Sequence, residues 1–528
     1  MGLLLRSFNG LDVLRSRVHC AESGASCVLL FCLVLVLFQW YSVGKKPNTT
    51  VPFVDTRLKG EYTFAGAKRR FVQDGGEILR SNLKKHSVFY TTTDKGPRLI
   101  LSGEYADEIR KQDEVFSHVK SLEADWLTRL PGFEPSTNGK AHGAFVKDMV
   151  MKLVRAMPTL AQPMSEEVGV ALVAHFGDKQ EWLEVPLSAT MVQIISQTST
   201  RAFIGKELCR NAEWIACSTA FAQDTFIAAQ SLHQWPRLLH GLMHRLLPPV
   251  RKLRWRMRQC QNLLEPILSL RRQQQKGQDN GRNNHNAHAP SGYEFNLLDL
   301  ILSSGEDGGE VHDPVIAQLA LSLAAIHSTA DLLGKVILDL ARNPHMLEPL
   351  RQEIIAVIGE RGLQLSAVTD LKLLDSVLKE TQRMNPVTIV PMRRISTQET
   401  ILADGTRIAK GTPIAVAHNR MMDADVYPEP ERWDGYRFYN GQGAGAEHGR
   451  ALVALSADHL GFGYGKHACP GRFFAAVETK IVLCHLLLRY DWALVDHSLP
   501  DVVTFGSFPI VNPNVKIAVR RRNSEIRL

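Results

Sequence analysis

The 528-residue sequence lacks the cysteine spacing of a disulfide framework or a zinc site. Its eight cysteines are scattered with no Cys-x-x-Cys pair, so we expect neither site and predict folding in a reducing compartment. Repeats of solenoid or propeller length are missing, and no glycine fingerprint for a dinucleotide follows an expected strand. No basic run interleaved with aromatic residues is present, so the formal charge of +8 does not predict nucleic-acid binding.

One long uncharged stretch is present near the N-terminus. Residues 27–43 contain no charged side chain and lie at the short end of the roughly 17–25 residues that cross a bilayer. Trp40 and Tyr41 stand where an interfacial aromatic belt would lie. A cleaved signal peptide is the competing interpretation, because residues 42–44 resemble a small-x-small cleavage site. The N-terminal segment 1–26 that precedes the apolar stretch favours a transmembrane anchor.

Beyond the apolar stretch, residues 44–60 form a proline-containing hinge and residues 61–528 one catalytic domain. The polar segment 273–290, rich in Asn, Gln and Gly, predicts an exposed loop between two helices. Asp313-Pro314 is a helix-start signal, and apolar residues recur with helical spacing up to Asn343. We therefore expect one central helix of about 29 residues, with a polar patch in its middle.

The densest group of special residues surrounds Cys469. Residues 461–471 hold four glycines and a proline, which predict a tight loop with inward-pointing N–H groups. A helix begins just after the cysteine, and its positive end would stabilise a thiolate. An inert buried thiol is the alternative for any lone cysteine and suits Cys484 better. A low-pKa nucleophile is a further alternative for Cys469.

Glu380 and Arg383 form a second pattern upstream. They lie one turn apart on a helix that ends before Pro386, so they share a face. Taken alone, this is the pattern of a weak surface ion pair.

The run from Phe462 to Gly471 resembles the heme-binding signature Phe-x-x-Gly-x-(Arg/His)-x-Cys-x-Gly of the cytochrome P-450 superfamily at every fixed position. The resemblance implies a mainly α fold, with a helix-rich domain, a smaller β-rich region and the N-terminal transmembrane helix. It also implies heme b, with Cys469 as the axial thiolate on the iron. Phe462 would cover the sulfur, Gly465 would let the loop turn under the heme, and His467 would meet an acidic group at the heme rim.

The Glu380 pair also resembles a family motif, Glu-x-x-Arg. In the family this pair is buried and joined by a second arginine, and the phrase from Pro428 to Phe438 makes Arg437 the corresponding residue here. The resemblance therefore implies that Glu380, Arg383 and Arg437 form a fully paired network that braces the cysteine loop.

The central helix departs from the family pattern (Ala/Gly)-Gly-x-(Asp/Glu)-Thr, because residues 324–329 read Ala-Ala-Ile-His-Ser-Thr. Ser328 occupies the position of the family's alcohol, which helps to deliver protons during oxygen activation, and Thr329 is next in line. His327 replaces the carboxylate and either shuttles protons or only hydrogen-bonds within the helix packing. Residues 320–324 and 387–391 would line the substrate pocket.

A family pattern for one heme propionate is missing. We find no clear Trp-x-x-x-Arg, and Lys152 and His142 are the candidate substitutes. The family often supplies a propionate arginine just after the Glu380 helix, so the resemblance implies that Arg393 or Arg394 has this role, and Arg393 is the predicted ligand. A guanidinium suits a carboxylate because it can bind it through two hydrogen bonds. A surface arginine is the alternative.

Within the superfamily the sequence looks most like fungal secondary-metabolite members of the ent-kaurene oxidase, indole-diterpene and meroterpenoid oxidase type. This likeness implies a biosynthetic monooxygenase for a large apolar small molecule, such as a terpenoid, meroterpenoid or prenylated indole alkaloid. It would use O2 and electrons from NADPH through NADPH-cytochrome P-450 reductase, with cytochrome b5 as an optional second donor. We expect the endoplasmic reticulum membrane as its location, with the catalytic domain facing the cytosol.

The predicted reductase contact consists of three basic residues in and after the cysteine loop, Lys466, Arg472 and Lys480. A plain solvated surface is the alternative. Two other functions stay open at this point. One is an O2-independent heme-thiolate isomerase or dehydratase, and the other is a non-catalytic heme sensor or carrier.

Overall fold

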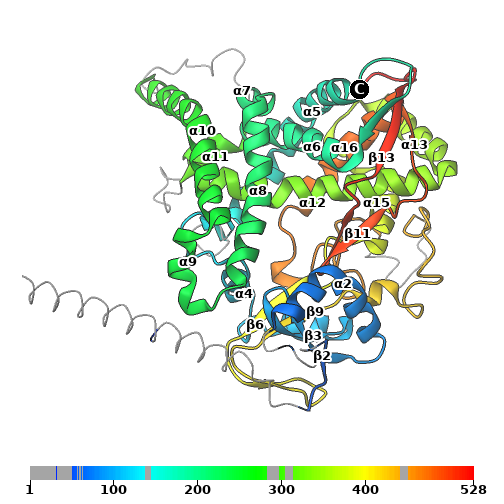
Figure 1. Cartoon of the computed structure of the whole chain (residues 1–528). Helices are drawn as coiled ribbons and strands as arrows, with labels where there is room; N and C mark the ends of the chain where they lie inside the picture. The colour runs from blue at the N-terminus through cyan, green and yellow to red at the C-terminus, as the bar shows by residue number, and fades with distance from the viewer. Residues whose placement is uncertain are drawn as a thin grey trace, which may run out of the picture.

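The computed structural model describes residues 50–55, 64–136, 144–281, 296–303, 313–439 and 450–528, together with Phe31, Leu58 and Glu61. Helices make up most of this part of the chain (Figure 1). They are α2 (Ala65–Leu83), α3 (Ala106–Lys111), α4 (His118–Trp126), α5 (Ala144–Phe176), α6 (Leu187–Phe203), α7 (Lys206–Cys209), α8 (Ala212–His233), α9 (His240–Leu246), α10 (Pro248–Gly281), α11 (Leu297–Ser303), α12 (Pro314–Arg342), α13 (Leu347–Arg361), α14 (Leu365–Thr369), α15 (Lys372–Met384) and α16 (Arg472–Arg489).

The strands are short and gather into small sheets. They are β1 (Phe53–Val54), β2 (Val88–Thr93), β3 (Gly96–Leu101), β4 (Phe116–Ser117), β5 (Leu183–Pro186), β6 (Met392–Ser396), β7 (Thr400–Ile401), β8 (Arg407–Ile408), β9 (Pro413–Val416), β10 (Tyr490–Leu494), β11 (Val502–Phe505), β12 (Phe508–Val511) and β13 (Lys516–Arg521). The largest sheet has the order β1-β2-β3-β9-β6-β4, and a second has the order β10-β13-β5. The predicted helix-rich body with a smaller β-region is confirmed.

The central helix begins and ends where the sequence predicts. The Asp313 carboxylate accepts hydrogen bonds from the backbone N–H groups of Val315 and Ile316, and Pro314 occupies the first turn. The helix ends at Arg342, one residue before Asn343. It runs through the middle of the molecule, with α8 and α10 at one end and α13 and α16 near the other (Figure 1). Among the described residues, α12 alone is long and apolar enough to cross a membrane, and most of its apolar window is buried in protein.

The large sheet lies below this helix and is covered by α2 (Figure 1). Phe71 and Leu79 of α2 pack against Phe89 and Ile100 on one face of the sheet. Strand β9 pairs in parallel with β3 and antiparallel with β6, so segments far apart in the sequence share one surface. This sheet positions β6 between the cysteine loop and the hairpin β11–β12.

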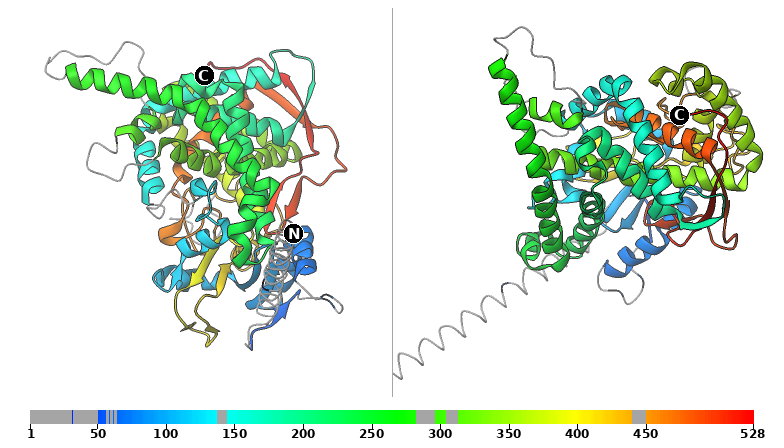
Figure 2. Two further views of the ribbon diagram at one scale, coloured as in Figure 1. Left: turned by 60° about the vertical axis from the view of Figure 1, so that its left-hand side comes forward. Right: turned by 90° about the horizontal axis from the view of Figure 1, so that it is seen from above.

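The polar segment 273–290 is not the simple loop that we predicted. Residues 273–281 continue α10, which extends away from the body (Figure 2), whereas 282–290 lie outside the described residues. Glutamine and lysine have good helix propensity, so polarity alone does not end a helix. The predicted anchor 27–43 also lies outside the described residues, apart from Phe31.

The cysteines differ in one respect from the expectation of no disulfide. Cys217 of α8 and Cys260 of α10 are joined by a disulfide in the structure. The two residues are 43 positions apart, so only the packing of the two helices brings them together. Cys209, Cys469 and Cys484 are free thiols.

Candidate active site

Cys469 lies at the end of a tight loop and just before α16. Its backbone N–H donates a hydrogen bond to the carbonyl of Phe462 at 2.8 Å, which closes the loop. Gly463 and Gly465 have φ angles of 72° and 76°, a region that glycine adopts without strain. A side chain at Gly465 would also press on Arg110 of α3, with a Cβ–Cβ distance of 3.0 Å. The loop therefore needs glycine at this point, as the sequence suggested.

The start of α16 provides groups that stabilise the thiolate form of Cys469. Burial raises its pKa, whereas hydrogen bonds from the backbone N–H groups of Gly471 and Arg472, and the charge of Arg472, act in the opposite direction. The Arg472 guanidinium also donates to the carbonyl of Cys469 at 3.0 Å. Hydrogen-bond donors and positive charge thus surround the sulfur, but burial still favours the neutral thiol. A cation bound directly to the sulfur would stabilise the thiolate.

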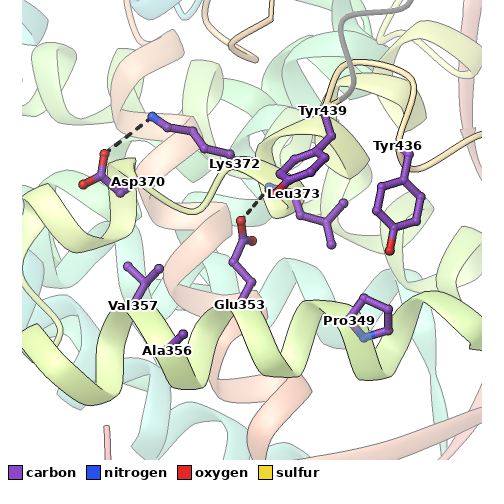
Figure 3. Close-up of a pocket in the computed structure, with 9 residues that line it drawn as sticks. All are labelled: Pro349, Glu353, Ala356, Val357, Asp370, Lys372, Leu373, Tyr436 and Tyr439. Atoms are coloured by element: carbon purple, nitrogen blue, oxygen red, sulfur yellow. Dashed lines mark hydrogen bonds and ion pairs between the residues drawn. The ribbon is translucent and has the colours of Figure 1, made fainter.

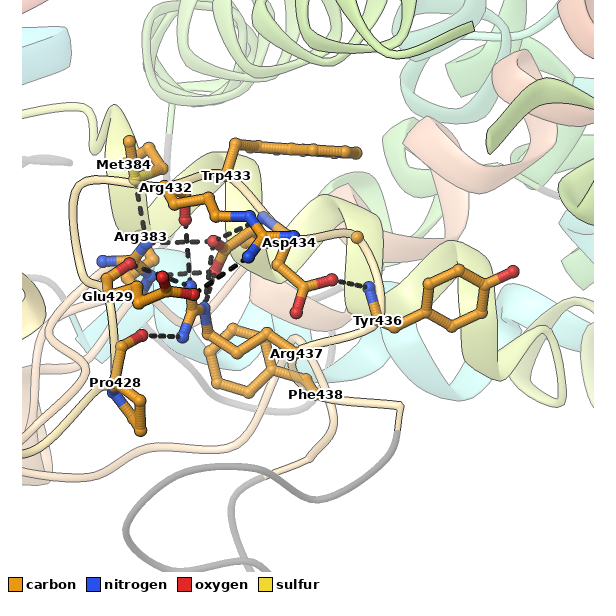
Figure 4. Close-up of polar contacts among 12 residues, drawn as sticks. Arg383, Met384, Pro428, Glu429, Arg432, Trp433, Asp434, Tyr436, Arg437 and Phe438 are labelled. Carbon is orange, nitrogen blue, oxygen red and sulfur yellow. Dashed lines mark hydrogen bonds and ion pairs between the residues drawn. The ribbon is translucent and has the colours of Figure 1, made fainter. Parts of the chain in front are cut away.

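Glu380, Arg383 and Arg437 form one buried network (Figure 4). The Arg383 guanidinium donates to both oxygens of Glu380, at 2.8 and 2.9 Å. Arg437 Nε reaches the same carboxylate at 3.0 Å, and the backbone N–H of Asp434 adds a fourth donor at 3.0 Å. The side chains of Glu380 and Arg383 are fully buried, so each charge depends on these partners.

The two arginines use their remaining donors on backbone carbonyls. Arg383 donates to the carbonyl of Met421, and Arg437 donates to those of Pro428 and Arg432 (Figure 4). The network therefore ties α15 to the segment 428–437. Helix α15 also touches the cysteine loop directly, because a side chain at Gly461 would collide with Gln382. These contacts connect the network with the loop that carries Cys469.

His467 lies in a cluster that the sequence did not reveal. Its imidazole pairs with the carboxylate of Asp113, and its ring lies 4.8 Å from the ring of His118. Arg394 is only 3% exposed. Its guanidinium lies 3.4 Å from His118 Nδ1 and donates to the carbonyl of Arg393 at 2.8 Å. Burial lowers the pKa of Arg394 to about 10 and that of His118 to about 4. Sequence reasoning missed His118, because only the pairing of β4 with β6 brings it to His467. It preferred Arg393 to Arg394, since the sequence does not show which of the two faces His467.

Arg393 points away from this cluster. Neighbouring residues of a strand face opposite sides of a sheet, so Arg393 and Arg394 diverge. The Arg393 guanidinium donates to Ser507 at 2.9 Å, lies 3.5 Å from Asp125 and stacks on Phe508. In this structure, the arginine beside His467 is Arg394. The predicted contact of Arg393 with a heme propionate stays a prediction.

The middle of α12 offers small side chains and polar groups. Ala324 is exposed although Leu321, Ser322 and Ile326 around it are buried, so the described residues leave the helix uncovered at this point. The Ser328 hydroxyl donates to the carbonyl of Ala324 at 3.0 Å and lies on the same side. Thr329 is 4% exposed and faces the core.

His327 lies against α8. Its Nε2 is 3.1 Å from the carbonyl of Thr219, which can only accept, so Nε2 donates and carries the proton. Burial lowers the pKa of His327, so the imidazole is neutral at pH 7. Of the two roles that we considered, hydrogen bonding in the helix packing has a partner in the structure. A role in proton delivery stays a prediction.

Several predicted residues lie elsewhere. Lys480 is 3% exposed and pairs with Asp375 at 2.6 Å, so the prediction that it belongs to a basic docking face is wrong. Lys480 lies about two turns after Arg472 on α16 and faces the core rather than solvent. Lys466 is exposed and pairs with Asp113. Lys152 pairs with Asp148, one turn away on its own helix, and His142 lies outside the described residues.

The predicted pocket lining is only partly open. Ala320, Ile389 and Val390 are buried, whereas Ala324 and Val387 are exposed. A different hollow lies at the surface between α13, the start of α15 and Tyr436–Tyr439 (Figure 3). There Glu353 accepts hydrogen bonds from the N–H groups of Leu373 and Leu374, so this carboxylate caps α15.

Comparisons with known proteins agree with this geometry. The family model for cytochrome P-450 matches residues 118–519. The chain is 37% identical over 472 residues to the cytochrome P-450 monooxygenase pyr9 of Aspergillus fumigatus, covering 89% of this chain and 90% of that one. It is 38% identical over 516 residues to the monooxygenase esdpI of Penicillium shearii, covering 96% and 97%. Among solved structures, the heme domain of cytochrome P450DA matches with a TM-score of 0.69 at 17% identity, covering 90% of this chain and 98% of that one, which shows a shared fold.

Proposed function

The chain belongs to the cytochrome P-450 family and is a monooxygenase, and from that premise we propose that it oxidises a large apolar secondary metabolite in a biosynthetic pathway. The substrate would be a terpenoid, a meroterpenoid or a prenylated indole alkaloid. The observation that carries the monooxygenase chemistry is the loop of Cys469, held by the buried Glu380 network. The small side chains on the exposed side of α12 and the apolar segment 387–391 are consistent with an apolar ligand.

The residues around Cys469 fit heme b. The sulfur has N–H donors and the charge of Arg472 beside it, while burial still favours the neutral thiol, so iron bound to the sulfur would stabilise the thiolate. The buried Arg394, with His118 and His467, offers cationic and hydrogen-bonding groups to the acid side chains of the cofactor. We expect Cys469 to hold the iron and these three residues to hold the propionates. Arg393 is the other candidate for a propionate contact.

A thiolate-ligated heme supplies oxygen activation: one oxygen atom enters a C–H bond of the substrate and the other leaves as water, with two electrons from NADPH. The protein contributes position and protons. The Ser328 hydroxyl, one turn from the exposed Ala324, would pass a proton to the side where oxygen is activated, with Thr329 as the alternative. Phe462 and the N–H groups of Gly471 and Arg472 control the environment of the sulfur.

Electrons require a partner flavoprotein, NADPH-cytochrome P-450 reductase, with cytochrome b5 as an optional donor. Lys466 and Arg472 remain the basic residues for its docking. The uncharged stretch 27–43 supports an anchor in the endoplasmic reticulum membrane, with the catalytic domain in the cytosol.

The test uses microsomes that contain the full chain and the reductase. They are incubated with NADPH, ¹⁸O2 and a panel of terpenoid and indole intermediates, and products are read by mass spectrometry. We expect at least one product that carries one ¹⁸O atom and forms only with NADPH. A product that forms without O2 would contradict the proposed reaction. Oxidation of fatty acids or of polar aromatic compounds, without any product from the terpenoid and indole intermediates, would contradict the proposed substrate class.

A further inference from the structure

A cluster of cations lies on the side of the large sheet opposite to Arg394. Arg393 of β6 pairs through Ala415 with Ile100 of β3, and Arg98 lies two residues before Ile100. Because side chains alternate along a strand, Arg393 and Arg98 share one face. Lys95, in the turn between β2 and β3, and Asp125, near the end of α4, complete the cluster.

The charges of this cluster do not balance. Arg98 Nη2 donates to Asp125 at 2.6 Å, whereas Arg393 Nη1 and Lys95 Nζ lie 3.5 and 3.8 Å from the other oxygen of that carboxylate. The last two distances exceed ordinary hydrogen-bond length, so Asp125 holds Arg98 more closely than it holds Arg393 or Lys95. Asp94 acts on Lys95 and Arg393 through its charge alone. Three cations therefore face two carboxylates, of which one makes a short contact.

Buried donors in the cluster lack partners. Arg98 is 5% exposed, and its Nη1 has no hydrogen-bond partner in the part of the chain that the structure describes. Thr91, which pairs with Arg98 across β2 and β3, is fully buried, and its hydroxyl is likewise without a partner among the described residues. An unsatisfied buried guanidinium is costly, and a ligand oxygen would remove that cost. Burial lowers the pKa of Lys95 to about 8, which an added anion would raise again.

The cluster is connected with the substrate side of the site. Arg393 donates to Ser507 and stacks on Phe508, the first residue of strand β12. That strand is tied to α12, because Lys335 donates to the carbonyl of Pro509 at 2.8 Å. Phe508 also packs edge-on against Phe226 of α8. Aromatic surface thus continues from the cations towards the central helix.

We propose that Lys95, Arg98 and Arg393 bind the carboxylate of an otherwise apolar substrate. The guanidinium of Arg98 offers the free Nη1 to one oxygen, and Lys95 and Arg393 supply charge to the other. The apolar body of the ligand lies along Phe508. This inference rests on the proposed function and narrows its substrate class to terpenoid acids, for which a simple alkyl acid serves below only as a binding probe.

A carboxylate at this cluster has a second source, the heme propionate predicted for Arg393. We favour the substrate as the source of this carboxylate, because His118 and Arg394 are the basic residues that lie beside His467 in the cysteine loop. Arg98 and Lys95 lie with Arg393 on the opposite face of the sheet. The cofactor and the substrate would therefore have separate basic sets.

The test measures ligand affinity on the heme-loaded full chain from the change in the heme absorption spectrum. Two matched pairs of probes are used, dodecanoic acid with 1-dodecanol and farnesoic acid with farnesol. We expect the wild type to bind at least one acid about tenfold more tightly than its alcohol, a ratio typical of a charge-assisted hydrogen bond. Arg98→Gln should bring this ratio close to one and leave the affinity for the alcohol unchanged.

Three further variants sharpen the result. Lys95→Gln, in a turn, should reduce the ratio several-fold without disturbing the fold. Asp125→Asn should raise the affinity for the acid, because it removes the competing carboxylate. Arg407→Gln, which alters an exposed arginine on β8 paired with Glu399, should change nothing.

Each outcome decides the matter. No preference for the acid in either pair, or a ratio that survives Arg98→Gln and Lys95→Gln, overturns the carboxylate site. Faster loss of heme to apomyoglobin in Arg98→Gln, with an unchanged ratio, assigns the cluster to the propionate and also overturns it. The carbon monoxide difference spectrum is recorded first: absence of the thiolate-type spectrum from the wild type would reject the proposed function itself.

Discussion

The two sides of the Cys469 site differ in how their polar groups are held. On the cysteine side, Glu380 receives donors from two arginines and one backbone N–H, and the side chains of Glu380, Arg383 and Arg437 are all buried. On the side of α12, Ser328 and His327 each bond to a helix carbonyl, and Ala324 beside them is exposed. The first arrangement tolerates little change, because the loss of one partner leaves a buried charge. The second can change without breaking the fold.

The largest effect should come from breaking the cysteine-side network. Glu380→Gln leaves two buried arginines without their carboxylate, so we expect the free energy of unfolding to fall by about 3–5 kcal/mol and heme content to drop. Glu429→Gln is the matched control, because Glu429 and Arg432 also form an i,i+3 pair but are each 71% exposed. Its expected cost is about 0–1 kcal/mol. Denaturant unfolding and heme-to-protein ratios measure both. An equal loss of unfolding free energy in Glu380→Gln and Glu429→Gln would show that the buried network is no more sensitive to change than an exposed ion pair.

A second buried carboxyl on the cysteine side, Glu478, tests the opposite case, in which no arginine pairs with the carboxylate among the described residues. Glu478 of α16 is fully buried and bonds to Ser199, and one of its oxygens has no partner among the described residues. Burial raises its pKa to about 8. Below pH 4.5 the group is protonated in both the folded and the unfolded states. Between pH 4.5 and 8 the unfolded state ionises first, so stability falls as the pH rises, by about 1.4 kcal/mol per pH unit.

Glu478→Gln removes this ionisation and keeps a hydrogen-bonding group. We expect its stability to exceed that of the wild type increasingly from pH 5.5 to 7.5, as read from urea unfolding at each pH. Parallel pH profiles of the two proteins would show that Glu478 ionises normally in the folded state.

The smallest effect should come from the open side of α12. Ser328→Ala removes a hydroxyl that bonds only to its own helix, so we expect an unchanged fold and a several-fold rise in hydrogen peroxide released per product formed. Thr329→Ala is the control, since Thr329 faces the core. Coupling is measured as NADPH consumed, peroxide released and product formed. A larger loss of coupling in Thr329→Ala than in Ser328→Ala would move the proton-delivery role to Thr329.

What the sequence predicted well was local. The start and end of α12 depend on Asp313, Pro314 and Asn343, and the turn of the cysteine loop depends on its own glycines. Both are set by neighbours in the chain. The contact of Arg437 with Glu380 was predictable only because the family resemblance named a third member, since 57 residues separate the two.

What the sequence could not predict depends on register and packing. His118 reaches His467 only through the pairing of β4 with β6, and Arg393 is separated from Arg394 by the alternation of one strand. Lys480 looked exposed because its charge suggested solvent, but its ammonium is satisfied by Asp375 and two backbone carbonyls. A buried cation with complete partners leaves no mark in composition.

The most direct test of the central claim, that Cys469 is the thiolate ligand of the heme, is the carbon monoxide difference spectrum of Cys469→Ser beside that of Cys484→Ser. Cys484 is a buried free thiol on the next helix, and burial raises its pKa to about 12. We predict that Cys484→Ser keeps the thiolate-type spectrum and that Cys469→Ser loses it. A thiolate-type spectrum that persists in Cys469→Ser, or disappears only in Cys484→Ser, would contradict the assignment of Cys469.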